Sequence, residues 1–215
     1  MSAIFLFNQE FLFRRKHLMF YKDDRLALFI DGANLYAAAK GLGMEIDYKK
    51  LHAEFMHRGK LNTVNYYTAM LEGEEVNPLR PLVDWLDYNG FNVVTKAARE
   101  YTDATGRRRV KGNMDVELVV DAMELIGKVD HVVLFSGDGD FRRLVESLQR
   151  NGIRVSVVST MKTTPPMIAD DLRRQANNFI ELDALRDTIA RPPRVFSDRD
   201  TGTPLQRGYA SDRAN

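Results

Sequence analysis

Short apolar runs alternate with amphipathic segments along most of the chain, from residue 25 to about residue 190. The runs are rich in β-branched and aromatic residues and predict strands. The segments between them carry apolar residues at helical spacing and often end at glycine, which predicts helices. The expected strands are residues 25–30, 63–71, 91–98, 131–135, 153–159 and 178–182, and the expected helices are residues 32–41, 47–59, 78–90, 114–127, 141–152, 165–176 and 183–190.

Strands that are apolar on both faces and alternate with helices are typical of a parallel sheet covered on both sides. The pattern therefore predicts a doubly wound α/β domain over residues 25–190, with a mostly parallel sheet and helices on both faces. Asp47 is the expected N-cap of the second helix. Residues 99–113 interrupt the pattern and are expected to form a polar, basic excursion with a turn near Gly106.

The two ends of the chain do not follow this pattern. Residues 1–24 form an N-terminal extension whose basic group follows its apolar part, which excludes a signal peptide, and its apolar runs are too short to span a membrane. Three interpretations stay open: a helix docking on the domain or a partner, a membrane-surface helix, or a mis-called start with Met19 as the true one. Residues 191–215 lack periodicity and are predicted to be disordered.

The composition excludes several kinds of chemistry but does not indicate a binding partner. The 215 residues include 31 Lys plus Arg and 30 Asp plus Glu, so a net charge of +1 argues neither for nor against nucleic acid. The absence of cysteine excludes disulfides, Cys-type zinc sites and thiol nucleophiles, and is compatible with the cytoplasmic location that we expect. The four histidines are scattered and match no zinc-binding spacing.

Acidic residues follow the predicted strands at the positions where open parallel sheets bind ligands. Asp31 ends the first strand, Asp138 and Asp140 follow the fourth, and Asp115 lies in the first turn of the helix after the basic excursion. Each acid alone has a structural explanation, as a helix cap or an Asx-turn. Together they would bring four carboxylates from three segments to one edge of the sheet.

A comparison of magnitudes favours a bound cation over helix caps alone. A helix N-terminus contributes about 0.3–1 kcal/mol beside an acid, whereas two carboxylates about 4 Å apart repel by roughly 4 kcal/mol at an effective dielectric of 20. Carboxylate oxygens are the ligands that Mg²⁺ and Mn²⁺ prefer. The neighbouring glycines allow close approach of a ligand, and Asn34 and Ser136 are candidates to bind a water or a phosphate oxygen.

Three stretches, "LALFIDGANLY", "KGNMDVELVVDAM" and "VVLFSGDGDFRRLVESLQRNGIRVSVV", resemble the NYN-domain family of PIN-like ribonucleases, in its bacterial LabA-like branch. The resemblance extends over residues 25–185 and includes "ADDLRRQANNFIEL" near its end. It implies a PIN-like fold and metal-dependent cleavage of RNA phosphodiester bonds. Asp31, Asp115 and Asp138 match the family's metal-binding aspartates.

The same resemblance assigns roles to further residues. Asp140 and Asn34 complete the pocket, and Lys111 lies in the family's Lys-Gly segment. No acid stands out near the second helix, where Glu54 is the candidate for a fourth ligand. Asp31 and Asp138 are the expected principal ligands of one or two Mg²⁺ or Mn²⁺ ions, with Asp115 and Asp140 binding directly or through water.

Our hypothesis is that the substrate is single-stranded or loop RNA. Lys111 is then expected to stabilise charge in the transition state. With Arg107, Arg108 and Arg109, it is also a candidate to contact the RNA backbone, although a solvated loop explains these four cations equally well. For Tyr36, packing in the core or at its rim is favoured over stacking on a base.

Other functions fit the sequence less well. A haloacid-dehalogenase-type phosphatase needs a second Asp where Ala33 stands, and no Walker or Rossmann glycine loop is present. A non-catalytic module that binds RNA or a protein through the same fold is the remaining alternative. The sequence leaves open whether the chain forms a homo-oligomer and whether it acts as an endonuclease or an exonuclease.

Overall fold

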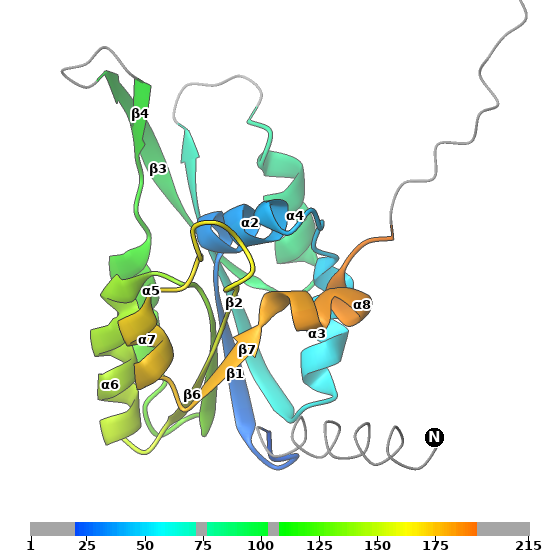
Figure 1. Ribbon diagram of the computed structural model, residues 1–215, viewed down its shortest axis with the longest axis vertical. Coiled ribbons are helices and arrows are strands. Elements are labelled where there is room, and N and C mark those ends of the chain that lie inside the picture. Colours follow the sequence, from blue (N-terminus) through cyan, green and yellow to red (C-terminus); the bar gives the residue numbers. More distant parts are fainter. Residues whose placement is uncertain (1–19, 72–76, 103–107, 193–215) are drawn as a thin grey trace, which may run out of the picture.

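Seven strands form one sheet in a computed structural model that describes residues 20–71, 77–102 and 108–192 (Figure 1). Its strand order is β4-β3-β2-β1-β5-β6-β7. The strands are β1 (Arg25–Asp31), β2 (Lys60–Leu71), β3 (Asn92–Thr102), β4 (Arg108–Lys111), β5 (His131–Phe135), β6 (Arg154–Ser159) and β7 (Asn178–Glu181). All neighbours from β3 to β7 pair in parallel, and β4 pairs with β3 antiparallel, which confirms the predicted mostly parallel sheet.

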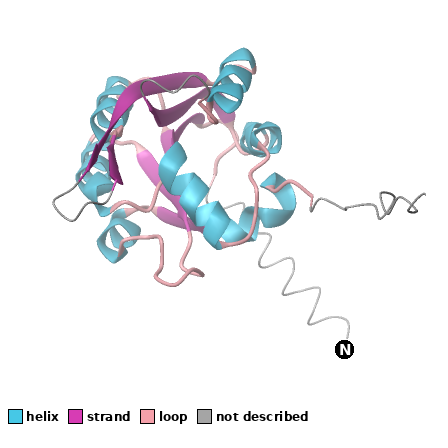
Figure 2. Cartoon of the chain, turned by 90° about the horizontal axis from the view of Figure 1, so that it is seen from above, coloured by secondary structure: helices cyan, strands magenta, loops and turns pink. Residues whose placement is uncertain are grey.

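Helices cover both faces of this sheet (Figure 2). They are α2 (Gly32–Gly41), α3 (Tyr48–Met56), α4 (Arg80–Tyr88), α5 (Asp115–Glu124), α6 (Arg142–Arg150), α7 (Asp170–Gln175) and α8 (Arg186–Ile189), with 3₁₀ turns η1 (Gly139–Phe141) and η2 (Leu182–Leu185). Alternate residues of β1 point to opposite faces, so Leu28 packs in the core under α2, α3 and α8, and Phe29 in the core under α5, α6 and α7. The fold is therefore the predicted doubly wound α/β architecture.

Local signals explain most helix boundaries. The carboxylate of Asp47 accepts the backbone N–H of Lys50 at 3.1 Å and caps α3, as predicted. The predicted helix over 165–176 is shorter, because α7 begins only at Asp170. The preceding loop carries two prolines without N–H groups, and the Ala169 N–H bonds to the Gly137 carbonyl instead of to a helical turn.

The basic excursion is more regular than predicted. β3 runs on to Thr102, and β4 returns beside it as an antiparallel ribbon that extends beyond the carboxyl edge of the sheet (Figure 1). The expected turn near Gly106 and the side chain of Arg107 lie outside the described residues. The sequence did not indicate this ribbon, because residues 99–113 are mostly polar or charged and show no alternation of apolar residues.

The described part of the chain begins before the predicted boundary at residue 25. Phe20 is buried, lies edge-on to Phe55 with ring centroids 5.9 Å apart, and stacks on His131 at 4.8 Å. The interpretations of residues 1–19 and the predicted disorder after residue 192 concern parts that are not described. Within the described ranges, no helix has the length and apolar character that crossing a membrane requires.

Candidate metal site at the carboxyl edge of the sheet

Strands β1 and β5 are parallel neighbours at the centre of the sheet, and their carboxyl ends lie side by side. The chain adds strands in opposite directions from this point: β2 lies next to β1 on one side, and β6 lies next to β5 on the other side. Such a switch point is where open α/β sheets bind ligands. It holds Asp31, the last residue of β1, and Ser136, the first residue after β5.

Asp31 is half-buried and has both carboxylate oxygens engaged. Oδ1 accepts the backbone N–H of Asn34 at 3.1 Å, which caps α2, and Oδ2 accepts the Ser136 hydroxyl at 3.1 Å. Burial raises the pKa of Asp31, and the charges of Asp115 and Asp138 raise it further. The carboxylate is thus held in one orientation while its ionised form is disfavoured by its surroundings.

The loop after β5 orders two more acids. The Ser136 hydroxyl also accepts the backbone N–H of Asp138 at 3.2 Å, and the Asp138 carboxylate accepts the N–H of Asp140 at 3.0 Å. Ser136 is 1% exposed, so its hydroxyl links Asp31 to Asp138 from beneath rather than facing solvent. The Asn34 Oδ1 accepts the N–H of Gly137 at 3.0 Å and ties this loop to the start of α2.

Asp115 reaches the same place from α5. The Asn113 side chain forms two bonds of 2.6 Å with it, accepting the Asp115 N–H and donating to the Asp115 carboxylate. Burial raises the pKa of Asp115, and the charges of Asp138, Asp140 and Glu117 add to the rise. Asp115 is therefore part of one electrostatic unit with the acids that follow β5.

Asp115, Asp138 and Asp140 each place one carboxylate oxygen within 4.8 Å of the others. At that separation a pair of carboxylates repels by roughly 3–4 kcal/mol at an effective dielectric of 20, more than the helix ends supply. The donor set consists of carboxylates alone, which suits a hard divalent cation such as Mg²⁺ or Mn²⁺. Asp31 is not one of these three residues, and its two oxygens accept bonds from Asn34 and Ser136.

Glycine allows the close packing behind the acids. A Cβ at Gly137 would overlap the Met167 carbonyl oxygen and approach the Ser159 hydroxyl to 2.6 Å. A Cβ at Gly32 would lie 2.5 Å from the Tyr66 hydroxyl. The loops after β1 and β5 can therefore approach the sheet edge only without side chains at these two positions.

The remaining predicted site residues are described in less detail or lie elsewhere. Arg108 and Arg109 pair through β4 with Thr102 and Tyr101, and Lys111 ends the same strand, but the described structure does not extend to their side chains. Glu54 is engaged elsewhere: its carboxylate accepts two bonds from Arg58, whose guanidinium lies over the ring of Phe20 at the opposite edge of the sheet.

Two residues of the site were not predicted. Asn113 bonds to both the backbone N–H and the carboxylate of Asp115. The sequence signal that could have indicated this residue is an Asn two residues before the acid, as in an Asx-turn. Glu117 lies in the first turn of α5, where its carboxylate accepts a hydrogen bond from Lys96 Nζ at 2.7 Å and its charge contributes to the raised pKa of Asp115. It was missed because an exposed-looking acid in a first helical turn has an ordinary explanation.

Comparisons with known proteins agree with this architecture. The NYN domain matches residues 25–183 of the chain. The Low amplitude and bright protein LabA of Synechococcus elongatus is 33% identical over 180 residues, which cover 82% of this chain and 93% of that protein. A protein of unknown function, VPA0982 from Vibrio parahaemolyticus, has a crystal structure that superposes with a TM-score of 0.63 at 26% identity, covering 79% of this chain and 97% of that one.

The NYN-domain match spans the sheet, Asp31 and the three acids of the cluster. The family is typically one of ribonucleases with a PIN-like fold. The chain belongs to the NYN domain family.

Proposed function

We propose that the chain is a divalent-metal-dependent ribonuclease that hydrolyses RNA phosphodiester bonds at the carboxyl edge of its sheet. The observation that carries this proposal is the group of Asp115, Asp138 and Asp140, whose ligand oxygens lie within 4.8 Å of one another beside the half-buried Asp31. Membership of a family that typically consists of ribonucleases supports RNA as the substrate.

In this proposal, some of these residues bind the metal ion and others hold the ion-binding residues in place. Asp115, Asp138 and Asp140 would ligate Mg²⁺ or Mn²⁺, with Asp31 as a direct or water-mediated ligand. When bound, such an ion lowers the pKa of a water molecule and offsets negative charge on the phosphate. Ser136 and Asn34 fix the relative positions of the loops that carry the acids, so that little reorganisation is needed during the reaction.

We propose that the cations that precede Asp115 in the sequence bind the substrate. Lys111 ends β4 next to the loop that leads to Asp115, and Arg108 and Arg109 precede it. In our proposal the arginines contact the RNA backbone and Lys111 offsets transition-state charge. Arg107 is proposed to contact the RNA backbone together with Arg108 and Arg109.

The test is cleavage of labelled single-stranded RNA and DNA with Mg²⁺, with Mn²⁺ and with EDTA. We expect RNA cleavage that requires the metal, and at least about 100-fold slower cleavage by the Asp138→Asn protein, since metal-mediated stabilisation is worth several kcal/mol. Asp23→Asn is the matched control, because Asp23 is exposed and pairs with Lys60 before β1, at the opposite edge. Cleavage by Asp138→Asn at the wild-type rate would overturn the assignment, and RNA binding without metal-dependent cleavage would favour a non-catalytic module.

A further inference from the structure

A groove runs between α2 and α4 on the sheet face opposite α5. It consists of two adjoining hollows of about 560 and 530 Å³, within the range of about 300–1,000 Å³ typical of ligand sites. Both hollows are lined by Tyr48, Leu82 and Arg191. Tyr36 of α2 lines the first and Trp85 of α4 lines the second.

Two of the aromatic side chains of this groove are accessible. Tyr36 is 65% exposed and Trp85 is 39% exposed, so the packing of Tyr36 in the core or at its rim that the sequence favoured is not what the structure shows. Aromatic rings that keep a free face can stack on an unpaired base, at about 1–3 kcal/mol per base, whatever its identity. A base paired within a duplex is already stacked and cannot reach them.

Helix α2 connects the groove to the acid cluster. It begins directly after Asp31, and Tyr36 lies four residues beyond Gly32, about 6 Å along the helix axis. Ala33, Tyr36, Ala37 and Lys40 are exposed at the spacing of one helix face. The small alanines leave that face open, and α2 contains no acidic residue that would repel a polyanion between the cluster and the groove.

The charges of the groove suit a phosphate backbone. Lys40 Nζ lies 5.8 Å from the centroid of the Tyr36 ring, where it can meet a phosphate next to a stacked base. Lys49 is exposed along the second hollow. The carboxylate of Asp47, which also lines it, is directed to the N-terminus of α3.

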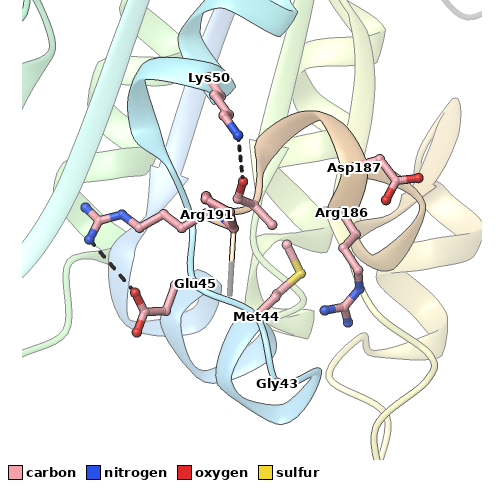
Figure 3. A pocket seen from close by; sticks show the side chains of 9 residues that line it. Gly43, Met44, Glu45, Lys50, Arg186, Asp187 and Arg191 are labelled. Atoms are coloured by element: carbon pink, nitrogen blue, oxygen red, sulfur yellow. Dashed lines mark hydrogen bonds and ion pairs between the residues drawn. The ribbon is translucent and has the colours of Figure 1, made fainter. Parts of the chain in front are cut away.

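A third hollow of about 500 Å³ adjoins the groove at Met44, Glu45 and Arg191 (Figure 3). Arg191 pairs with Glu45 there at 3.9 Å, and Lys50 donates to the Ala190 carbonyl at 3.1 Å. The Glu45 carboxylate offsets part of the charge of Arg191, which also lines the groove, and Lys40 and Lys49 add further positive charge there.

We propose that the α2–α4 groove binds unpaired nucleotides of an RNA strand whose scissile phosphate lies at the acid cluster, with Tyr36 and Trp85 stacking on bases. This inference rests on the proposed ribonuclease function and narrows its substrate to RNA with a single-stranded stretch on one side of the cut. The groove distinguishes single-stranded RNA from paired RNA, but not one base from another, because every base has a face that can stack.

Trp85 is the chain's single tryptophan, so its fluorescence reports on the groove directly. The full chain is titrated in EDTA with a single-stranded RNA oligonucleotide of about twelve nucleotides and, separately, with a blunt RNA duplex of the same sequence. We expect single-stranded RNA to quench Trp85 and the duplex to leave it unchanged. Failure to bind the single strand, or binding without a change in Trp85 emission, would overturn the proposal.

Variants separate stacking from general binding. Tyr36→Ala is expected to weaken single-strand binding about five- to 150-fold, the range of one lost stacked base, and Tyr36→Phe is expected to retain it. Tyr88→Ala is the control, because Tyr88 is 92% exposed on α4 and lines neither hollow. Equal affinities for Tyr36→Ala and wild type would overturn the proposal.

A parallel cleavage assay with Mn²⁺ distinguishes failure of the groove from failure of the enzyme. Metal-dependent cleavage with no effect of Tyr36→Ala on binding would refute the groove and leave the ribonuclease proposal standing. Tyr36-dependent binding without cleavage would support the groove and refute the ribonuclease proposal.

Discussion

The side-chain oxygen of Asn34 accepts the backbone N–H of Gly137 at 3.0 Å, joining the first turn of α2 to the loop after β5, 103 residues away in sequence. The Asn34 backbone N–H donates to Asp31, and the residue after Gly137 is Asp138. One amide therefore connects the two segments that carry these acids. Its side-chain oxygen thereby helps to fix the relative position of the two segments that carry Asp31 and Asp138.

Asn34→Ala is expected to lower the free energy of unfolding by about 1–3 kcal/mol, because the N–H of the buried Gly137 loses its partner. Thermal or urea unfolding in EDTA measures this directly. The control is Asn151→Ala, which removes an exposed bond to the Ser147 carbonyl and should change stability by less than about 1 kcal/mol. Equal losses for the two variants would show that the Asn34 bond has no special role in holding the site.

Gly137→Ala is expected to destabilise the protein by about 1–3 kcal/mol or more, because a Cβ there overlaps the Met167 carbonyl oxygen and the backbone must shift. Gly139→Ala is the matched control in the same loop. A Cβ at Gly139 would lie 3.2 Å from the Ala169 Cβ, a tight contact that a small displacement relieves. Circular dichroism melts of the two proteins give the comparison, and a Gly137→Ala protein as stable as Gly139→Ala would refute the packing argument.

The sequence predicted the fold because the apolar runs of strands such as β1 and β5 are buried on both faces, which leaves little choice of architecture. It also predicted that Asp31, Asp115, Asp138 and Asp140 lie near one edge. That followed from topology, since parallel strands present their carboxyl ends together.

The detailed arrangement at the site could not be read from the sequence. Which three of the four acids lie within 4.8 Å of one another depends on how the segments pack, which the sequence pattern does not give. The exposure of Tyr36 was equally hidden, because helical spacing alone does not say whether a ring faces a neighbouring helix or a groove. Side-chain contacts between distant segments decide both features.

Asp115→Asn is expected to raise the melting temperature in EDTA. The pKa of Asp115 is raised in the folded state, so its proton is bound more tightly there, and its ionised form at pH 7 costs stability. Because the side chain is half-buried, solvent screening limits the gain to about 1 kcal/mol, or about 2–4 °C. Differential scanning fluorimetry with and without EDTA measures it.

Asp115→Asn also tests whether Asp115 binds a metal ion. Excess Mg²⁺ or Mn²⁺ should raise the melting temperature of the wild-type protein, since a ligand that binds only the folded state stabilises it. The rise should be smaller in Asp115→Asn, and it should fade as the pH falls toward the raised pKa values of Asp31 and Asp115. An identical metal-induced shift in both proteins would exclude Asp115 as a ligand.

His131 makes the stability of the fold depend on pH at the edge opposite the acids. Its ring is fully buried, Nε2 lies 2.8 Å from the Ser156 hydroxyl, and Phe20 stacks on it. Burial lowers the pKa of His131 to about 3, and the charge of Arg154 adds to this effect. The Asp24 carboxylate, 3.8 Å from Nδ1, pairs with Arg154 and does not reverse the shift.

The folded protein therefore keeps His131 neutral while the unfolded chain takes up a proton below about pH 6.5. Stability is fully present above that value and falls by up to about 1.4 kcal/mol per pH unit toward pH 3. His131→Gln, which cannot titrate, should show a shallower loss in urea unfolding between pH 6.5 and pH 4.5. His57→Gln, at an exposed position, should keep the wild-type slope, and an equal slope in all three proteins would assign the acid sensitivity to other groups.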